Sequence, residues 1–281
     1  MNKIENAGKG RRGPGGKGPF KYRNPEDNHV IWPGRAKALR EFIEQPYAGM
    51  KHKLKNAHSS NSEDALTWSC FDVLAHVAYD ARRRALMDIW ELSFGTRDAP
   101  DGVLSGTIAI GKPYGDEEAT EVDASIEGPG VLVFIEAKLY APMSQASPSK
   151  NKPHNQIERK LRVGLREAAR GKKSFYFVLL DLAPLDTLRM LNPGASLEEA
   201  TTTPAAGFGR KWLTAYWFAR YKYGSRGSHA PLRKLLRDAR FDDPNARDVA
   251  ARMGWLTWAD LYKAVLRAAV ETCQGKKWEH S

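Results

Sequence analysis

The chain has 281 residues, with 44 lysines and arginines, 33 aspartates and glutamates, and a formal net charge of +11. This length fits one large domain, or one domain with an appended lobe. No stretch approaches the length of a membrane span, and the polar N-terminus lacks the apolar segment of a signal peptide. Cys70 and Cys273 lack metal-ligand spacing and are typical of buried thiols in a reducing compartment. We therefore expect a soluble, cytoplasmic protein.

The charge is unevenly distributed along the chain. Residues 1–60 hold 13 Lys/Arg and 5 Asp/Glu, residues 61–200 hold 16 and 21, and residues 201–281 hold 15 and 7. An acidic centre between basic flanks suits a metal-dependent enzyme that acts on a polyanion, because acids bind the ion and basic flanks bind phosphates. The alternative is that the flanks are solvated or disordered, as charge runs usually are.

The N-terminal segment is predicted to lie outside the core. Residues 1–24 are rich in Gly, Lys, Arg and Pro, and such a composition cannot bury a core. A short helix is expected over residues 35–44. We predict a basic, partly disordered arm over residues 1–57, which either contacts DNA or is a flexible tail.

A helix is predicted to begin near Glu63. Asn61 and Ser62 are both good N-cap residues, and acids in the first turn complement the helix dipole. An apolar stripe at helical spacing follows, and the helix extends to Trp90 with or without a break. A strand over residues 103–110 and a turn over residues 112–118 come next.

The most informative stretch is a predicted β-hairpin. Residues 131–135 are apolar and rich in β-branched side chains, which indicates a strand buried on both faces. The turn 128–130 joins it to a preceding strand and brings Asp123 opposite Ile135 or Glu136, depending on register. Side chains alternate along a strand, so Glu136 and Lys138 point to the same side. Two neighbouring carboxylates repel unless a cation joins them, and oxygen ligands favour Mg²⁺ or Mn²⁺.

A basic helix is predicted after the hairpin. Residues 141–153 are loop-like, and the helix runs from about residue 154 to a C-cap at Gly171. One face of this helix is apolar and another is a row of arginines, which we favour as a nucleic-acid contact over a solvated face. A buried strand over residues 174–180 completes a parallel βαβ unit.

Residues 186–281 are predicted to form a basic, aromatic-rich, helical C-terminal region. Aromatic and basic side chains alternate over residues 212–223 and could stack on bases, but their helical spacing favours a buried aromatic face. Further amphipathic helices are expected over residues 230–240 and 245–272.

Asp123, twelve intervening residues, and then Glu136-x-Lys138 at the end of an apolar strand resemble the active-site signature of the PD-(D/E)XK nuclease superfamily. Val122 stands where a proline is nominally expected. The resemblance implies that residues 58–185 form a restriction endonuclease-like α/β core, a mixed central sheet flanked by helices. It also implies that Glu63 and Gln156 join the site. The alternatives are that Glu63 only complements the helix dipole and that Gln156 only bonds locally.

The resemblance implies a Mg²⁺-dependent DNA nuclease, and we expect an endonuclease of restriction, phage defence or repair. The alternative is a nucleic-acid-binding protein with an inactive nuclease-like core; the basic flanks disfavour a small-molecule hydrolase. The partner is DNA, and a homodimer is compatible with the sequence. The expected catalytic residues are Asp123, Glu136, Lys138 and Gln156, and the expected ligands of Mg²⁺ or Mn²⁺ are Glu63, Asp123, Glu136 and the Ala137 carbonyl. The expected DNA contacts are Lys150, Lys152, Arg159, Lys160, Arg162 and Arg166.

Overall fold

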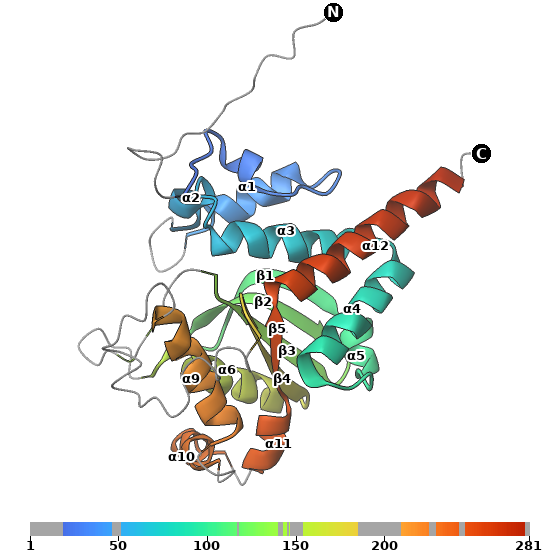
Figure 1. Cartoon of the computed structure of the whole chain (residues 1–281). Coiled ribbons are helices and arrows are strands. Elements are labelled where there is room, and N and C mark those ends of the chain that lie inside the picture. Colours follow the sequence, from blue (N-terminus) through green and yellow to red (C-terminus); the bar gives the residue numbers. More distant parts are fainter. Residues whose placement is uncertain are drawn as a thin grey trace, which may run out of the picture.

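The structure is a computed structural model, and it describes residues 19–46, 52–116, 118–139, 143–144, 146, 154–184, 209–224, 229–241 and 245–278. Its centre is a sheet of five strands in the spatial order β1-β2-β3-β4-β5 (Figure 1). The strands are β1 (Thr107–Tyr114), β2 (Thr120–Gly128), β3 (Val131–Ala137), β4 (Ser174–Asp181) and β5 (Met253–Thr257).

The sheet combines antiparallel and parallel pairing. β1, β2 and β3 form an antiparallel meander, and β4 and β5 are added in parallel. Gly130, in the turn between β2 and β3, has a φ of +67°, which glycine adopts without steric cost. The pair Ala124↔Ile135 sets the register and places Asp123 opposite Glu136. The predicted hairpin and the predicted parallel βαβ unit are both confirmed.

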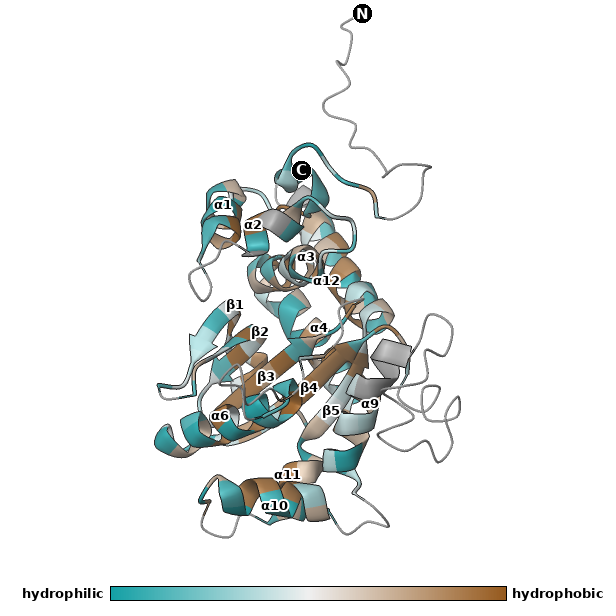
Figure 2. Cartoon of the chain, turned by 90° about the vertical axis from the view of Figure 1, so that its left-hand side faces the viewer, coloured by the Kyte–Doolittle hydropathy of each residue, from teal (hydrophilic) through white to brown (hydrophobic). Residues whose placement is uncertain are grey.

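Helices cover both faces of the sheet, which confirms an α/β fold with a mixed sheet flanked by helices (Figures 1 and 2). α3, α4, α5 and α12 share one apolar core with the sheet, and α6, α9, α10 and α11 share the other. Figure 2 shows strongly hydrophobic strands, β3 and β4, between these layers. Within the described residues, no helix is long and apolar enough to cross a membrane. The helices are α3 (Glu63–His76), α4 (Tyr79–Phe94), α5 (Asp101–Leu104), α6 (Gln156–Arg170), α9 (Gly209–Lys222), α10 (Ala230–Asp238), α11 (Ala246–Ala251) and α12 (Trp258–Trp278).

The helix predicted from residue 61 onwards is two helices. Ser62 is the N-cap of α3, and its hydroxyl accepts a hydrogen bond from the Ala65 N–H at 3.2 Å. The backbone leaves helical geometry at Val77 and Ala78, with ψ angles of 163° and 143°, so that α4 starts in a new direction. The cap places Glu63 in the first turn of α3, near the end of the central strands where the charged cluster described below lies.

The N-terminal region is more ordered than the sequence predicts. The 3₁₀-helix η2 (Pro25–Asn28) and the helices α1 (Ala36–Glu44) and α2 (His52–Ala57) precede α3. Leu39, Phe42 and Ile43 of α1 pack with Trp68 of α3 in a small apolar cluster. The short helix expected over residues 35–44 is confirmed as α1, whereas η2 and α2 were not predicted. The second half of the predicted arm over residues 1–57 is therefore packed against α3. Residues 1–18 lie outside the described residues.

The C-terminal region is not a separate helical unit. Residues 253–257, predicted as part of a helix, form β5 and pair in parallel with β4. The sheet therefore extends beyond residue 185, where the sequence analysis predicted that the nuclease-like core ends. Gly254 lies close beneath the Phe94 ring, where an added Cβ would approach to 2.9 Å. A strand of five residues between two helices carries too little periodicity to be recognised from its sequence.

The first predicted strand is also displaced. Residues 101–104 form α5, and β1 extends from Thr107 through the predicted turn to Tyr114. The Tyr114 hydroxyl donates a hydrogen bond to the Ser125 hydroxyl on β2 at 2.9 Å, which fixes the end of β1 to the sheet. Lys112 and Pro113, which the sequence predicts in a turn, pair with β2 instead, because an edge strand tolerates both lysine and proline.

Tight packing of α6 on β4 gives a test of the fold. A Cβ at Gly164 would come within 2.1 Å of the Phe175 ring, whereas a Cβ at Gly275, in α12, would meet nothing within 4 Å. We expect Gly164→Ala to lower the free energy of unfolding by about 1–3 kcal/mol through overpacking. Gly275→Ala should be neutral or stabilising by up to about 1 kcal/mol, because alanine favours the helix. Denaturant midpoints measure both, and equal shifts would contradict the packing described.

Candidate functional site

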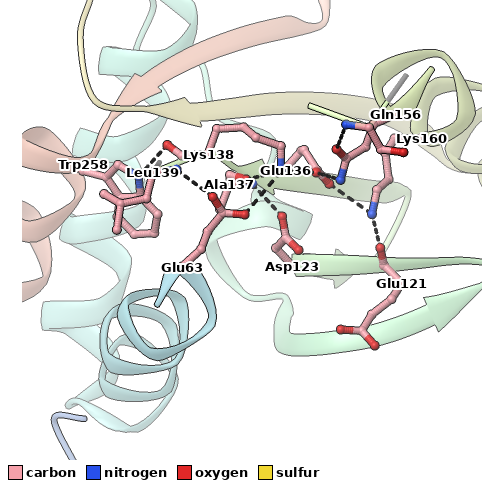
Figure 3. Close-up of polar contacts among 11 residues, drawn as sticks. Glu63, Glu121, Asp123, Glu136, Ala137, Lys138, Leu139, Gln156, Lys160 and Trp258 are labelled. Carbon is pink, nitrogen blue, oxygen red and sulfur yellow. Dashed lines mark hydrogen bonds and ion pairs between the residues drawn. The ribbon is translucent and has the colours of Figure 1, made fainter. Parts of the chain in front are cut away.

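Charged side chains from four elements meet at one end of the sheet (Figure 3). Glu63 comes from the start of α3, Asp123 from β2, Glu136 from the end of β3, Lys138 from the residues just after it, and Gln156 from the start of α6. The structure thus brings together all the side chains that the sequence analysis assigned to catalysis or metal binding.

The β2–β3 ladder opens where Asp123 lies. The backbone pairing ends at Ala124, and the Asp123 carboxylate accepts the Ala137 N–H at 2.7 Å in its place. On β1, Gly111 has a φ of +62° and interrupts the regular pairing opposite Asp123. Val122 and Ala124 pack in opposite cores, although residues two apart share a face in a regular strand. This local distortion re-aims the Asp123 side chain into the site.

Glu136 is the centre of the cluster. It is 1% exposed, and three donors surround its carboxylate. Oε1 accepts hydrogen bonds from the Lys138 ammonium at 2.8 Å and from the Gln156 amide, and Oε2 lies 3.0 Å from the Lys160 ammonium. Burial alone would raise the pKa of Glu136, but the Lys138 and Lys160 ammonium groups outweigh it and lower this pKa to about 2.

The Lys138 ammonium lies among three oxygens. They are the Ala137 carbonyl at 2.6 Å, Glu136 Oε1 at 2.8 Å and Glu63 Oε1 at 3.3 Å. Burial would lower the pKa of Lys138, but the Glu136, Glu63 and Asp123 carboxylates raise it above its usual value. Lys138 is therefore a protonated cation held by the site.

Glu63 is tied to the residues that follow β3. Its Oε2 accepts the Leu139 N–H at 2.6 Å, and its Oε1 contacts Lys138. Burial raises the pKa of Glu63, and the Lys138 ammonium and the Leu139 N–H only partly offset this. These long-range contacts go beyond complementing the dipole of its own helix.

Asp123 and Glu136 lie next to each other, but their pKa values shift in opposite directions. Burial raises the pKa of Asp123 well above its usual value, and the neighbouring Glu136 charge raises it further. Glu136 has the closest ammonium groups and stays ionised, whereas Asp123 is left with repulsion that the lysines do not fully cancel. The site has a deficit of positive charge beside Asp123.

The start of α6 contributes two side chains. Asn155 is the N-cap and accepts the Glu158 N–H at 3.0 Å. The Gln156 amide reaches Glu136 on one side and accepts the Ser144 N–H at 3.1 Å on the other. Lys160, one turn later, is 2% exposed and donates a hydrogen bond to the Glu121 main-chain carbonyl. Lys160 was predicted as a DNA contact, but the structure places it inside the acidic cluster.

Two of the three arginines predicted to contact DNA pair with an acid of the same chain. Arg162 is 7% exposed, and Arg162 and Arg166 both pair with Glu118 in the β1–β2 connection, at 3.2 Å and 3.7 Å. Arg159 is half-buried. Lys150 and Lys152 lie outside the described residues. Contact of the arginine row with DNA stays a prediction.

The sequence analysis missed two residues near the site, Lys53 and Trp258. Lys53 of α2 is 4% exposed and pairs with the Glu121 carboxylate at 2.8 Å. The Trp258 indole N–H donates to the Lys138 carbonyl at 3.0 Å. Lys53 stood out only as one of several basic residues, and Trp258 lies 120 residues from its partner. No local signal connects them to the hairpin.

The donor set of the site suits a hard cation. Glu63, Asp123, Glu136 and the Ala137 carbonyl offer only oxygen atoms, as Mg²⁺ and Mn²⁺ prefer. Within the described ranges, however, no group of three or more His, Cys, Asp or Glu side chains is arranged to hold a metal ion. Ammonium groups and main-chain N–H groups occupy the carboxylates instead. The residues fit the ion chemically, and Glu136 Oε2, which is buried and forms an ion pair with Lys160, accepts no hydrogen bond from the described residues.

Because the pKa of Asp123 is raised and that of Glu136 is lowered, replacing each carboxyl by an amide should change the stability of the protein in opposite directions. In the metal-free protein, Asp123→Asn should raise the melting temperature at pH 7, because it removes a carboxylate whose ionisation is disfavoured in the fold. Since the folded pKa of Asp123 is raised, this gain should disappear as the pH falls to about 4, where the unfolded carboxyl also protonates.

Glu136→Gln should instead destabilise the protein by about 3–5 kcal/mol, because it leaves Lys138 and Lys160 without their shared counter-charge. With its pKa near 2, Glu136 stabilises the fold above about pH 4.5 and loses this contribution as the pH falls toward 2. Thermal unfolding across pH measures both effects, and shifts of the same sign at pH 7 would contradict the charge distribution described.

Comparisons with models of protein families, with curated proteins and with solved structures gave no significant match to this chain.

Proposed function

We propose that this protein is a Mg²⁺-dependent DNA nuclease with a restriction endonuclease-like core, and that it hydrolyses phosphodiester bonds as an endonuclease in the cytoplasm. The observation that carries the proposal is the meeting of Glu63, Asp123, Glu136 and Lys138 at one end of a mixed sheet (Figure 3). Three acids and a lysine from α3, β2 and the end of β3 lie together there, and Glu136 and Lys138 are buried. Clusters of buried, perturbed charges are typical of functional sites.

The Glu63, Asp123 and Glu136 carboxylates and the Ala137 carbonyl would hold the ion. A bound Mg²⁺ or Mn²⁺ lowers the pKa of a water molecule and neutralises charge on the scissile phosphate. Asp123 is well suited to this role, because burial and the neighbouring Glu136 charge raise its pKa, and a bound cation would stabilise its ionised form.

Lys138 would act as a cation and not as a base. The surrounding carboxylates raise its pKa, so the ammonium stays protonated at neutral pH. A fixed positive charge stabilises the negative charge that develops on the phosphate oxygens in the transition state. Gln156 holds Glu136 in place through its amide and would orient water or a phosphate oxygen with the same group.

DNA is the proposed partner because the chain ends carry the positive charge. Residues 1–60 hold 13 Lys/Arg against 5 Asp/Glu, and residues 201–281 hold 15 against 7. These flanks would bind the phosphate backbone while the acidic centre binds the ion. A homodimer would allow both strands of a duplex to be cut.

One observation favours a second candidate, a nucleic-acid-binding protein with an inactive nuclease-like core. Both oxygens of Glu136 are already engaged by Lys138, Gln156 and Lys160. If these contacts were permanent, Glu136 would have no oxygen free for a metal ion.

The test is incubation of supercoiled plasmid and linear DNA with the protein, with and without Mg²⁺. We expect cleavage that requires Mg²⁺ and falls at least about a hundredfold in Asp123→Asn and Lys138→Met. Loss of cleavage in Asp123→Asn would not be due to unfolding, because that substitution is expected to stabilise the metal-free fold. Arg84→Ala is the control, because Arg84 pairs with Glu271 on the protein surface and should leave cleavage unchanged.

Cleavage that persists in Asp123→Asn would rule out the proposed mechanism. DNA binding that weakens steeply with salt, without cleavage under any metal condition, would establish the inactive-core candidate.

A further inference from the structure

The Lys138 ammonium occupies a defined nest of oxygens. Its nitrogen is 2.6 Å from the Ala137 carbonyl, 2.8 Å from Glu136 Oε1 and 3.3 Å from Glu63 Oε1 (Figure 3). All three oxygens belong to groups that the proposed function assigns to the metal ion. An ammonium and a divalent ion cannot share one nest, because both need the same oxygens and like charges repel.

We propose that Lys138 is a resident counter-ion that a divalent metal ion displaces from this nest. The inference rests on the metal site of the proposed function and adds how that site is occupied without the ion. The ammonium keeps the buried carboxylates compensated when no metal is bound. When the ion binds, the same ammonium becomes available to a negatively charged substrate beside it.

The main chain around Lys138 allows this exchange without disturbing the fold. The Lys138 N–H donates to the Leu180 carbonyl at 2.7 Å, and the Lys138 carbonyl accepts the Trp258 indole N–H at 3.0 Å. Both contacts fix the backbone on the β4 and α12 side. The lysine side chain is a flexible four-carbon stem, so its ammonium can move while the backbone stays.

Lys160 differs from Lys138, although both pair with Glu136. Lys160 contacts the other oxygen, Oε2, at 3.0 Å, and donates to a main-chain carbonyl, that of Glu121. It has no contact with Glu63 or with the Ala137 carbonyl among the interactions of the described residues. Displacement of Lys138 therefore leaves Glu136 with one permanent ammonium partner, and Lys160 provides an internal control for the experiment.

The first experiment uses the wild-type protein and a small amine-reactive reagent. Without metal, the Lys138 and Lys160 side chains are 8% and 3% exposed, and both should be protected from acylation. Addition of Mg²⁺, without DNA and at matched ionic strength, should raise labelling of Lys138 at least about tenfold, because the ammonium leaves the nest. Labelling of Lys160 should not change. Peptide mass spectrometry measures both.

The second experiment measures Mg²⁺ affinity by calorimetry in Lys138→Met and Lys160→Met. A ligand that must displace a resident group binds more weakly by the fraction of time the site is open. Lys138→Met should therefore bind Mg²⁺ about tenfold more tightly than wild type, and Lys160→Met should not. A general effect of removing positive charge would strengthen binding in both variants and would contradict the exchange. If Lys138→Met does not fold, wild-type labelling decides the question.

The two proposals fail in different ways. Metal binding with unchanged Lys138 labelling overturns the exchange even if the protein cleaves DNA. Metal-dependent labelling without DNA cleavage supports the exchange and overturns the nuclease assignment. Absence of any Mg²⁺ or Mn²⁺ binding by calorimetry overturns both.

Discussion

The buried Glu136 carboxylate is the interaction on which the site depends. A carboxylate that is 1% exposed is costly to ionise unless it is paired, and Lys138 and Lys160 provide a partner for each oxygen. Lys138 comes from the same strand end and Lys160 from the next helix of the chain. The same contacts that keep Glu136 charged therefore also fix the start of α6 against the end of β3.

The opening of the β2–β3 ladder provides the space for this arrangement. A continued ladder would use the Ala137 N–H for a backbone hydrogen bond, but the Asp123 carboxylate takes it instead. The main-chain hydrogen bond is thus satisfied while a second carboxylate is brought beside the first. Placing the two carboxylates together disfavours the ionised form of Asp123, and burial and the Glu136 charge therefore raise its pKa. The position of the Asp123 carboxylate therefore accounts both for the irregular pairing of β2 with β3 and for the raised pKa of Asp123.

Local patterns in the sequence predicted the hairpin, the N-cap of α3, the βαβ unit and the meeting of Asp123 with Glu136. Each of these depends on residues close in sequence or on the fixed alternation of a strand. The strand β5, the packing of α1 and α2 against α3 and the contact of Trp258 with Lys138 depend on packing between distant segments, which periodicity does not encode. Lys160 shows the limit clearly, because the sequence marked it as a DNA contact but could not tell that its side chain is buried.

The charges of the cluster bear on the proposed exchange of Lys138 for a divalent ion. Four carboxylates, of Glu63, Glu121, Asp123 and Glu136, face three ammonium groups, of Lys53, Lys138 and Lys160. Without the ion, burial and the Glu136 charge raise the pKa of Asp123 and disfavour the fourth negative charge, which brings the cluster closer to balance with the three ammonium groups. If a divalent ion takes the nest and Lys138 leaves it, four ionised carboxylates face the ion and two ammonium groups, and the charges balance again. A buried cluster tolerates only such balanced states, because each uncompensated charge costs several kcal/mol of desolvation. In the proposed exchange the lysine would therefore have two functions in one position: it compensates the carboxylates of the metal-free fold, and it is the charge that the ion would replace.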